Sequence, residues 1–294
     1  MRQRALALVV IATLLVTTAA PVFAQRPADV TDLELTFGEW LRAALASELQ
    51  PDPNVAHTAT IESEPGVQPP KSRKASLPPE AIVVRKGPRS SGAVALTFDD
   101  GFDLEACASI ANTLRANGAV GTFFINGIWI AERPARWRAA LKGMEFANHT
   151  RSHRNLAEAP RGKITRQIDE NEQIQERALG RPMSKVLRPP YGAQDRLVRQ
   201  VAKELGYDVI ALWSRDTRDW SASATVRSIV KRATGAPAGS VILMHCGPDA
   251  TAKAVPKIVR YYQRQGIKLA GLSTVLKGAK GTVSGGKVET YGGE

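Results

Sequence analysis

The sequence predicts an α/β protein in which parallel strands alternate with helices, arranged as a barrel or near-barrel of about seven βα units. Two observations carry this prediction. Between residues 81 and 276, short apolar runs alternate with segments of helical character. Polar side chains also follow the apolar runs directly, at the ends of strands that converge on one mouth in a parallel barrel.

The individual elements follow from local signals. Apolar runs predict strands at 93–98, 121–126, 144–147, 186–188, 208–213, 241–244 and 267–270. Helical periodicity predicts helices at 103–117, 137–142, 163–179, 195–205, 225–233 and 252–265. Asp103 is placed to cap its helix, and Gly118, Gly180 and Gly206 stand where helices end.

The segments outside this domain have different compositions. Residues 1–24 read as a signal peptide, with Arg2 and Arg4 before an apolar run and cleavage after Ala24. A membrane anchor is the alternative, but the run is shorter than the ~20 residues of a spanning helix. Residues 25–80 hold a short amphipathic helix (33–49) and a proline-rich linker (51–79), and the glycine-rich tail 277–294 is expected to be disordered.

Charge and cysteine content narrow the partners. The chain has 40 Lys+Arg against 28 Asp+Glu, which suits an anionic wall polymer or a merely solvated basic surface. Export to the cell envelope or the medium argues against nucleic acid as a partner, and signal cleavage leaves no stable membrane anchor.

Export also permits a disulfide between Cys107 and Cys246. Sequence separation says nothing about their geometry, and we expect two unpaired, buried side chains.

Two histidines and an adjacent aspartate pair form a candidate metal site. His149 and His153 are four residues apart, so on one helical turn both imidazoles would project to the same side. Asp99 or Asp100 supplies an oxygen ligand. Two His and one carboxylate leave positions open for water and substrate, as in catalytic sites. Ordinary loop histidines are the alternative.

The second aspartate has a separate use. It can take a proton from water whose pKa a metal lowers toward ~7. A departing amine must receive a proton, and His245, after the apolar run 241–244, is the available acid. Taken alone, His245 would be better interpreted as a buried structural histidine.

Five ordered motifs resemble those of the NodB-type polysaccharide deacetylases, carbohydrate esterase family 4. The resemblance covers about residues 93–276, and each motif is weak alone but specific as an ordered set. The motifs are Thr97-Phe98-Asp99-Asp100-Gly101, His149-x-x-x-His153, Arg188-Pro189-Pro190-Tyr191-Gly192, Asp216-x-x-Asp219-Trp220 and Leu243-Met244-His245.

The resemblance implies a distorted (β/α)7 barrel with an N-terminal extension, and a metal-dependent hydrolase. Asp99 would be the general base, and Asp100, His149 and His153 would hold a divalent metal. That metal would be Zn²⁺, or another ion such as Co²⁺ or Mn²⁺. The backbone N–H of Tyr191 would stabilise the oxyanion.

The remaining positions would support these groups. Arg188 would orient Asp99, and Asp219 would hold His245 as the general acid. Trp220 and Leu243 would line the pocket for the acetyl methyl group. The alternatives are that Trp220 and Leu243 are core residues and that Arg188 and Asp219 form a structural ion pair.

The favoured function is hydrolysis of N-acetyl groups on an amino-sugar polymer. Peptidoglycan N-acetylglucosamine is the first choice, chitin oligomers the second, and O-acetylated xylan a third. A non-heme iron oxygenase shares the two-His, one-carboxylate pattern, but has no use for the paired aspartate and distant acid. A glycan-binding module without catalysis would not need an intact Asp99 and His245.

Overall fold

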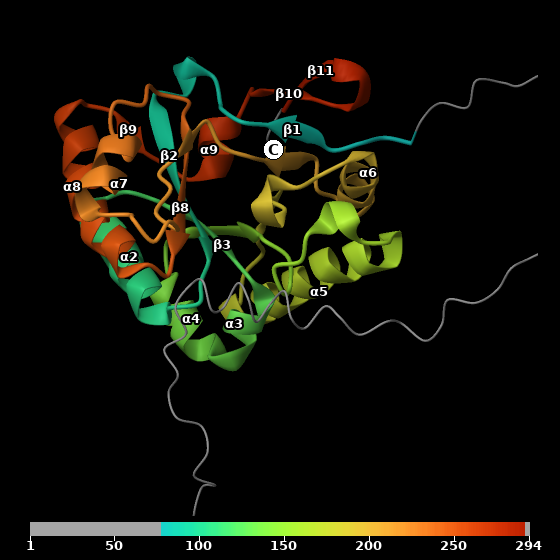
Figure 1. Ribbon diagram of the computed structural model, residues 1–294, viewed down its shortest axis with the longest axis horizontal. Helices are drawn as coiled ribbons and strands as arrows, with labels where there is room; N and C mark the ends of the chain where they lie inside the picture. Colours follow the sequence, from blue (N-terminus) through green and yellow to red (C-terminus); the bar gives the residue numbers. More distant parts are fainter. Residues whose placement is uncertain (1–77, 292–294) are drawn as a thin grey trace, which may run out of the picture.

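The computed structural model describes residues 78–291, and its strands form one sheet (Figure 1). Along this part of the chain, β1, β6, β5, β4, β3, β2, β8 and β7 pair in that order, each parallel to the next. Their bounds are Ile82–Val84 (β1), Ala93–Asp100 (β2), Thr122–Ile125 (β3), Glu145–Asn148 (β4), Ser184–Leu187 (β5), Val209–Ala211 (β6), Arg215–Asp216 (β7) and Val241–Cys246 (β8).

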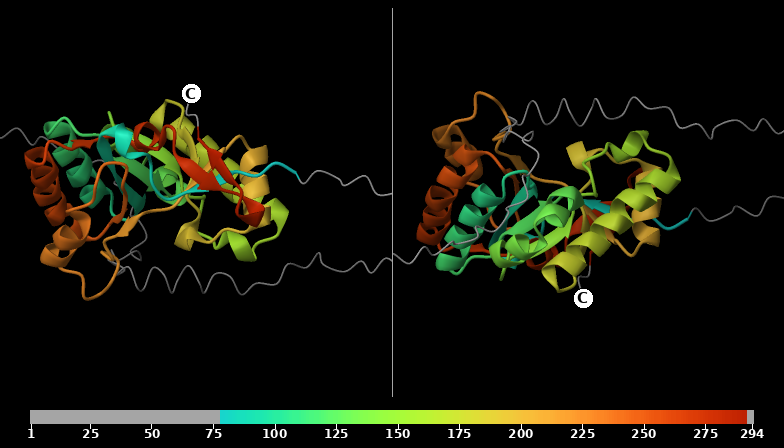
Figure 2. Two further views of the ribbon diagram at one scale, coloured as in Figure 1. Left: turned by 90° about the horizontal axis from the view of Figure 1, so that it is seen from above. Right: turned by 90° about the horizontal axis from the view of Figure 1, so that it is seen from below.

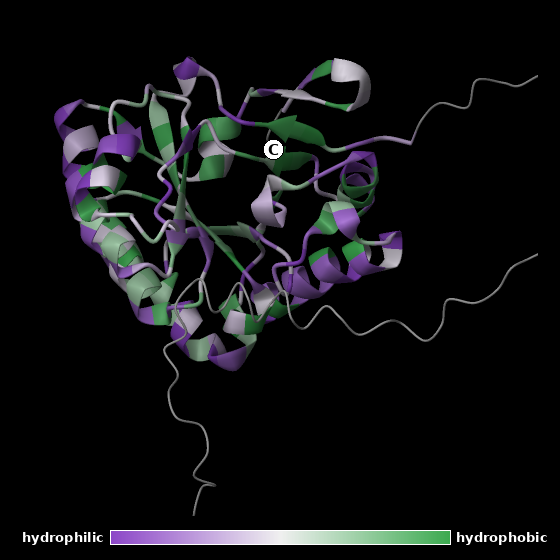
Figure 3. Ribbon diagram, viewed as in Figure 1, coloured by the Kyte–Doolittle hydropathy of each residue, from purple (hydrophilic) through white to green (hydrophobic). Residues whose placement is uncertain are grey.

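Helices pack outside this sheet, as βα alternation requires. They are α2 (Leu104–Ala116), α3 (Gly127–Glu132), α4 (Pro134–Ala140), α5 (Arg161–Leu179), α6 (Arg196–Glu204), α7 (Val226–Ala233) and α8 (Asp249–Arg264). Figure 3 shows polar residues on the outward faces of α5 and α8 and apolar residues along β1 and β6. Within residues 78–291 no pairing joins β7 to β1, so the expected α/β barrel is confirmed in an open form.

Alternation along the strands separates an inner core from an outer one. Ala93 and Ala95 of β2 face the interior, whereas Val94, Leu96 and Phe98 pack under the helices. A short helix, α9 (Leu272–Leu276), contributes Leu272, Val275 and Leu276 to the inner cluster. The same alternation turns Thr97 and Asp99 inward, which brings polar groups to the open end of the barrel.

Local signals located most helix ends to within one or two residues, but the helix expected at 137–142 is α4 at Pro134–Ala140. Asp103 accepts N–H groups of Glu105 and Ala106 at the start of α2. Gly180 has a left-handed φ of 69° after α5, as a C-terminal glycine should. Thr225 forms a capping box with Ser228 at α7.

The expectation of a disordered tail is wrong for residues up to 291. Strands β10 (Lys280–Thr282) and β11 (Val288–Thr290) form an antiparallel hairpin, and β10 pairs with β1. Figure 2 shows this hairpin beside β1. Another short strand, β9 (Lys268–Leu269), lies against β2. The expected signal peptide, the helix at 33–49 and all but the end of the linker lie outside the described residues.

The expectation that the two cysteines are unpaired is wrong. Cys107 of α2 and Cys246 of β8 form a disulfide, with their Cα atoms 5.0 Å apart. Both side chains are fully buried on the outer, helix-covered face of the sheet. The bond therefore joins a helix to the strand beneath it.

None of the helices in residues 78–291 has the length and apolar character needed to cross a membrane.

Candidate active site

The two aspartates are the last residues of β2 rather than the first of a loop. In a regular strand they would point to opposite faces. Asp100 instead has a left-handed φ of 73°, which breaks the alternation, and both carboxylates line one cavity. His149 Nε2 lies 3.4 Å from Asp100 Oδ1 and 3.9 Å from Asp99 Oδ2.

The two histidines do not lie on a helical turn, which corrects the sequence expectation. They belong to an irregular loop after β4, in which Thr150 and His153 have left-handed φ values of 68° and 58°. The Thr150 hydroxyl accepts the N–H of His153. On the α5 side, Gln167 accepts backbone N–H groups of Arg151 and Ser152. These local bonds bring the imidazoles together without helical geometry.

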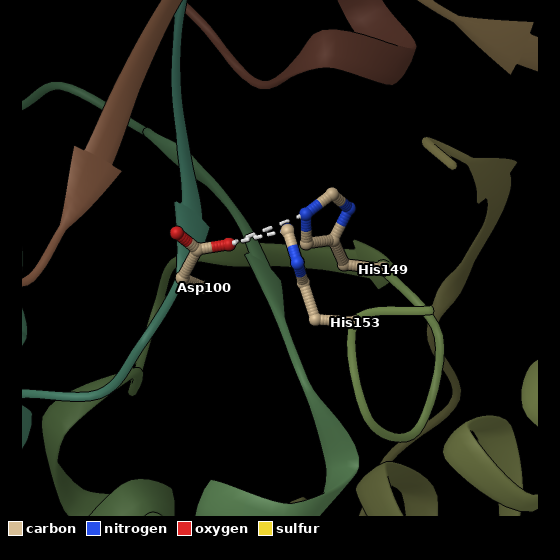
Figure 4. Close-up of side chains that lie close together, drawn as sticks. All are labelled: Asp100, His149 and His153. Atoms are coloured by element: carbon tan, nitrogen blue, oxygen red, sulfur yellow. Dashed lines mark ion pairs between the residues drawn. The ribbon is translucent and has the colours of Figure 1, made fainter. Parts of the chain in front are cut away.

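Asp100, His149 and His153 converge on one point (Figure 4). Their candidate ligand atoms lie within 4.8 Å of one another, and His153 Nε2 is 3.2 Å from Asp100 Oδ1. Both oxygens of the buried Asp100 lack a hydrogen-bond partner among the described residues. The Nδ1 of His149 lies 2.6 Å from the carbonyl oxygen of Arg188, so Nδ1–H donates there and Nε2 is left as a ligand. The donor set fits a divalent metal of the zinc type.

The charges around Asp100 also support its role as a metal ligand. Burial is the largest influence on its pKa and raises it, but the charges and contacts of His153 and His149 prevail. The pKa of Asp100 therefore lies well below its ordinary value. The group is an anion at neutral pH, as a metal ligand must be.

Arg188 lies behind Asp99, fully buried at 0% exposure. Its Nη1 donates to Asp99 Oδ1 at 2.7 Å and to the Thr97 hydroxyl at 2.8 Å, and its Nε donates to the Ala211 carbonyl. The guanidinium also lies 4.1 Å from the centre of the Phe124 ring. Burial lowers the pKa of Arg188, and Asp99 opposes that shift. Asp99 is thus held in one orientation by a charged partner.

Asp219 holds His245 in the same way, on the strand next to β2. Asp219 Oδ1 lies 2.7 Å from His245 Nδ1, and Oδ2 accepts both the His245 backbone N–H and the Thr251 hydroxyl. Burial is the largest influence on the pKa of His245 and lowers it. The ion pair with Asp219, and more weakly the charges of Asp100 and Asp99, outweigh burial and raise the pKa to about 10. Arg188 and Asp219 thus serve different partners and do not pair with each other.

The cavity between these groups has a volume of about 320 Å³. Eight of the ten expected site residues line it, while Arg188 and Asp219 stand behind their partners. Trp220, 45% exposed, lies at the rim and is not a core residue, and Leu243 is buried but reaches the cavity wall. Tyr191, 52% exposed, packs its ring edge-on against His153.

Trp213 and Asp216 line the cavity wall, although the sequence assigned them no role. Trp213 lines the cavity beside Gly192, where a Cβ would lie 3.0 Å from its ring. Asp216 also lines the wall, and its carboxylate accepts the backbone N–H of Arg218. Trp213 lies two residues after β6, and Asp216 is the last residue of β7. Asp216 comes three residues after the strand predicted at 208–213, so its position was an available signal.

Backbone strain is concentrated at this site. Five non-glycine residues in the described part of the chain have a left-handed φ, and each is in the site or next to a site residue. They are Asp100, Thr150, His153, Tyr191 and Arg218. Such conformations cost about 1–3 kcal/mol each and cluster where function requires a particular orientation.

Comparisons with known proteins agree with this architecture. A family model described as polysaccharide deacetylase matches residues 86–210. A peptidoglycan-N-acetylglucosamine deacetylase of Bacillus cereus is 31% identical over 207 residues, which are 68% of this chain and 96% of that protein. A chitooligosaccharide deacetylase of Azorhizobium caulinodans is 32% identical over 167 residues, covering 56% of this chain and 79% of that protein.

A solved structure shows the same fold. The family 4 carbohydrate esterase from Streptomyces lividans, in complex with acetate, is 32% identical and superposes with a TM-score of 0.58. The match covers 64% of this chain and 96% of that one. The chain therefore belongs to the NodB-type polysaccharide deacetylases, carbohydrate esterase family 4. This class hydrolyses N-acetyl carbon–nitrogen bonds of polysaccharides, which excludes the iron oxygenase alternative.

The Asp219–His245 pair predicts a specific pH dependence. If His245 donates a proton, turnover is sustained while its imidazole is protonated and falls as pH rises through its pKa. That pKa is about 10 without a bound dication, and a dication nearby would lower it by charge repulsion. Asp219→Asn removes the main charge that raises the pKa, so the falling limb should move toward the ordinary histidine value near 6.5. Acetate release measured between about pH 5 and 11 gives the falling limb of the pH–rate profile for the wild type and for the variant. An unchanged limb in Asp219→Asn would rule out His245 as the titrating acid.

Proposed function

We propose that this chain is an exported, zinc-dependent deacetylase that removes N-acetyl groups from peptidoglycan N-acetylglucosamine. The observation that carries the proposal is the shared cavity. It presents a buried metal-ligand set, a carboxylate held by Arg188 and an imidazole held by Asp219, all within one 320 Å³ space. A deacetylase needs a base, an acid and an electrophilic centre in that arrangement.

The base and acid follow from what holds each group. Asp99 has Oδ1 engaged by Arg188, which leaves Oδ2 to take a proton from the attacking water. With its Nδ1–H directed at Asp219, His245 carries its transferable proton on Nε2. That proton goes to the nitrogen of the departing amine. The two groups lie on neighbouring strands, since Asp99 is opposite His245 in the β2–β8 register.

Asp100, His149 and His153 would hold the metal. When bound, the metal supplies Lewis-acid activation of water and of the acetyl carbonyl. The backbone N–H of Tyr191 would stabilise the developing oxyanion, and such a donor is worth about 10²–10³ in rate. Leu243 and Trp220 would enclose the acetyl methyl group.

The choice of polymer rests on export and charge. An N-terminal signal peptide would deliver the protein to the cell envelope, and a formal charge of +12 favours an anionic wall polymer. The relatives named as peptidoglycan deacetylases point the same way. Chitin oligomers are the second candidate, as the chitooligosaccharide deacetylases show comparable identity.

The test is acetate release by purified residues 25–294 from peptidoglycan and from chitin oligomers. We expect release that a chelator abolishes and added zinc restores, with peptidoglycan the better substrate. Faster release from chitin oligomers would change the polymer but retain the reaction. No release from either polymer by metal-loaded protein would replace the proposal with an ester substrate, such as acetylated xylan, or with glycan binding alone.

A further inference from the structure

The disulfide lies directly beside the histidine that we propose as the acid. Cys246 is the residue after His245 at the end of β8, and it is bonded to Cys107 in α2. Helix α2 is therefore covalently attached to the strand end that carries His245. Neither cysteine lines the cavity, so the disulfide can affect the site only through the position of β8 and α2.

Helix α2 is also closely tied to the strand end that carries the two aspartates. Only Gly101, Phe102 and Asp103 separate β2 from α2, and Asp103 caps the first turn of the helix. In the β2–β8 register Asp100 is opposite Cys246. The chain from Asp100 to Cys107, the disulfide and the β-ladder thus form a short closed ring around the ends of both catalytic strands.

The segments leaving these two strands are packed without spare room. A Cβ on Gly247, which follows Cys246, would lie 2.2 Å from the ring of Phe102. The loop after β8 is therefore in direct contact with the loop after β2. Asp219 holds the imidazole and the backbone N–H of His245 from the opposite side. Of these restraints on the end of β8, only the disulfide is covalent.

We propose that the Cys107–Cys246 disulfide is a positioning element for His245, which sets the placement of the proton donor relative to Asp99. The proposal rests on the proposed function, in which His245 protonates the departing amine. Both sulfurs are fully buried, so a solution reductant reaches them only slowly, when the structure around them opens. The bond is a permanent clamp formed after export, where disulfides persist, and not a redox switch.

The decisive experiment compares two substrates that differ in their need for an acid. Release of an amine from a chitin oligomer requires a proton from His245, whereas release of 4-nitrophenolate from 4-nitrophenyl acetate does not. We expect the double variant Cys107→Ala/Cys246→Ala to lose roughly 10- to 100-fold in kcat on the oligomer, as misplaced catalytic groups do. Its kcat on the ester should stay within about threefold, because that leaving group needs no general acid. The zinc content should equal that of the wild type.

Ile110→Val is the matched control. Ile110 is buried on the same helix, three residues from Cys107, but has no bond to β8. Its ratio of amide to ester turnover should match the wild type. A double variant that loses activity equally on both substrates, or on neither, would keep the wild-type ratio of amide to ester turnover and would overturn the clamp. A wild-type enzyme inactive on both polymers would overturn the proposed function, and the clamp with it.

A second measurement needs no variant. Dithiothreitol reduces the disulfide by giving it two electrons and two protons, and itself closes to a cyclic disulfide. We expect the amide-to-ester ratio of the wild type to hold at first and then fall in step with the appearance of two thiols. If thiols appear without a change in the amide-to-ester ratio, the proposal is overturned. If the ratio falls as soon as dithiothreitol is mixed in, the disulfide is not protected by burial and the clamp account is overturned.

Discussion

Asp99→Asn is expected to lower deacetylation by about 10²–10⁴-fold while zinc remains bound. The substitution keeps the shape of the side chain but removes the basic oxygen that faces the cavity. The substitution leaves the proposed metal ligands Asp100, His149 and His153 unchanged, and Asp99 Oδ2 is 3.9 Å from His149 Nε2. Acetate release and calorimetric zinc titration, measured on the same protein, separate the two effects.

The substitution has a structural cost that must be controlled. Arg188 is fully buried, and Asp99 is the carboxylate with which it pairs. Breaking a buried pair by removing one partner typically costs about 3–5 kcal/mol. We therefore expect Asp99→Asn to lower the unfolding temperature, and Asp99→Asn/Arg188→Gln to recover part of it. Activity should recover in neither variant. Recovery of activity with stability would mean that Asp99 acts through folding and not as a base.

The parts of the site that the sequence predicted depend on short-range rules. The position of polar residues after apolar runs placed Asp99, Asp100 and His245 at one end of a parallel sheet. Those rules hold because a strand's period and a helix cap involve neighbouring residues only. The polar clusters could therefore be expected to share one mouth of the barrel, whereas the roles of Arg188 and Asp219 came from the resemblance to a known family.

The parts that were wrong or missed depend on long-range contacts. The loop from His149 to His153 has the spacing of a helical turn, but Gln167 of α5 and the left-handed Thr150 give it another path. The disulfide joins residues 139 positions apart, and their distance is set by how α2 packs on β8. The hairpin of β10 and β11 exists because β1 offers it an edge, and β1 itself has only three residues, too few to stand out as a strand.

His149→Ala is expected to weaken zinc binding by more than about 100-fold, since even the loss of an outer partner costs 10–100-fold. It removes one of two imidazole ligands and leaves the buried Asp100 carboxylate facing a single one. Zinc should raise the unfolding temperature of the wild type and of Asp99→Asn, because a ligand that binds only the folded state stabilises it. It should not raise that of His149→Ala.

Ser152→Ala is the matched control for this loop. Its side chain lies between the two histidines in sequence but contacts Gln167 and not the ligand set, so zinc affinity should be retained.

The contrast between Asp99→Asn and His149→Ala tests how the aspartate pair divides its roles. If Asp99→Asn loses zinc as completely as His149→Ala, then Asp99 is a ligand, and the base must be sought elsewhere on the cavity wall. If Asp99→Asn keeps zinc and loses turnover, adjacent residues of one strand hold the metal and move the proton. The kink at Asp100, with its left-handed φ, is then what allows both carboxylates to serve one cavity.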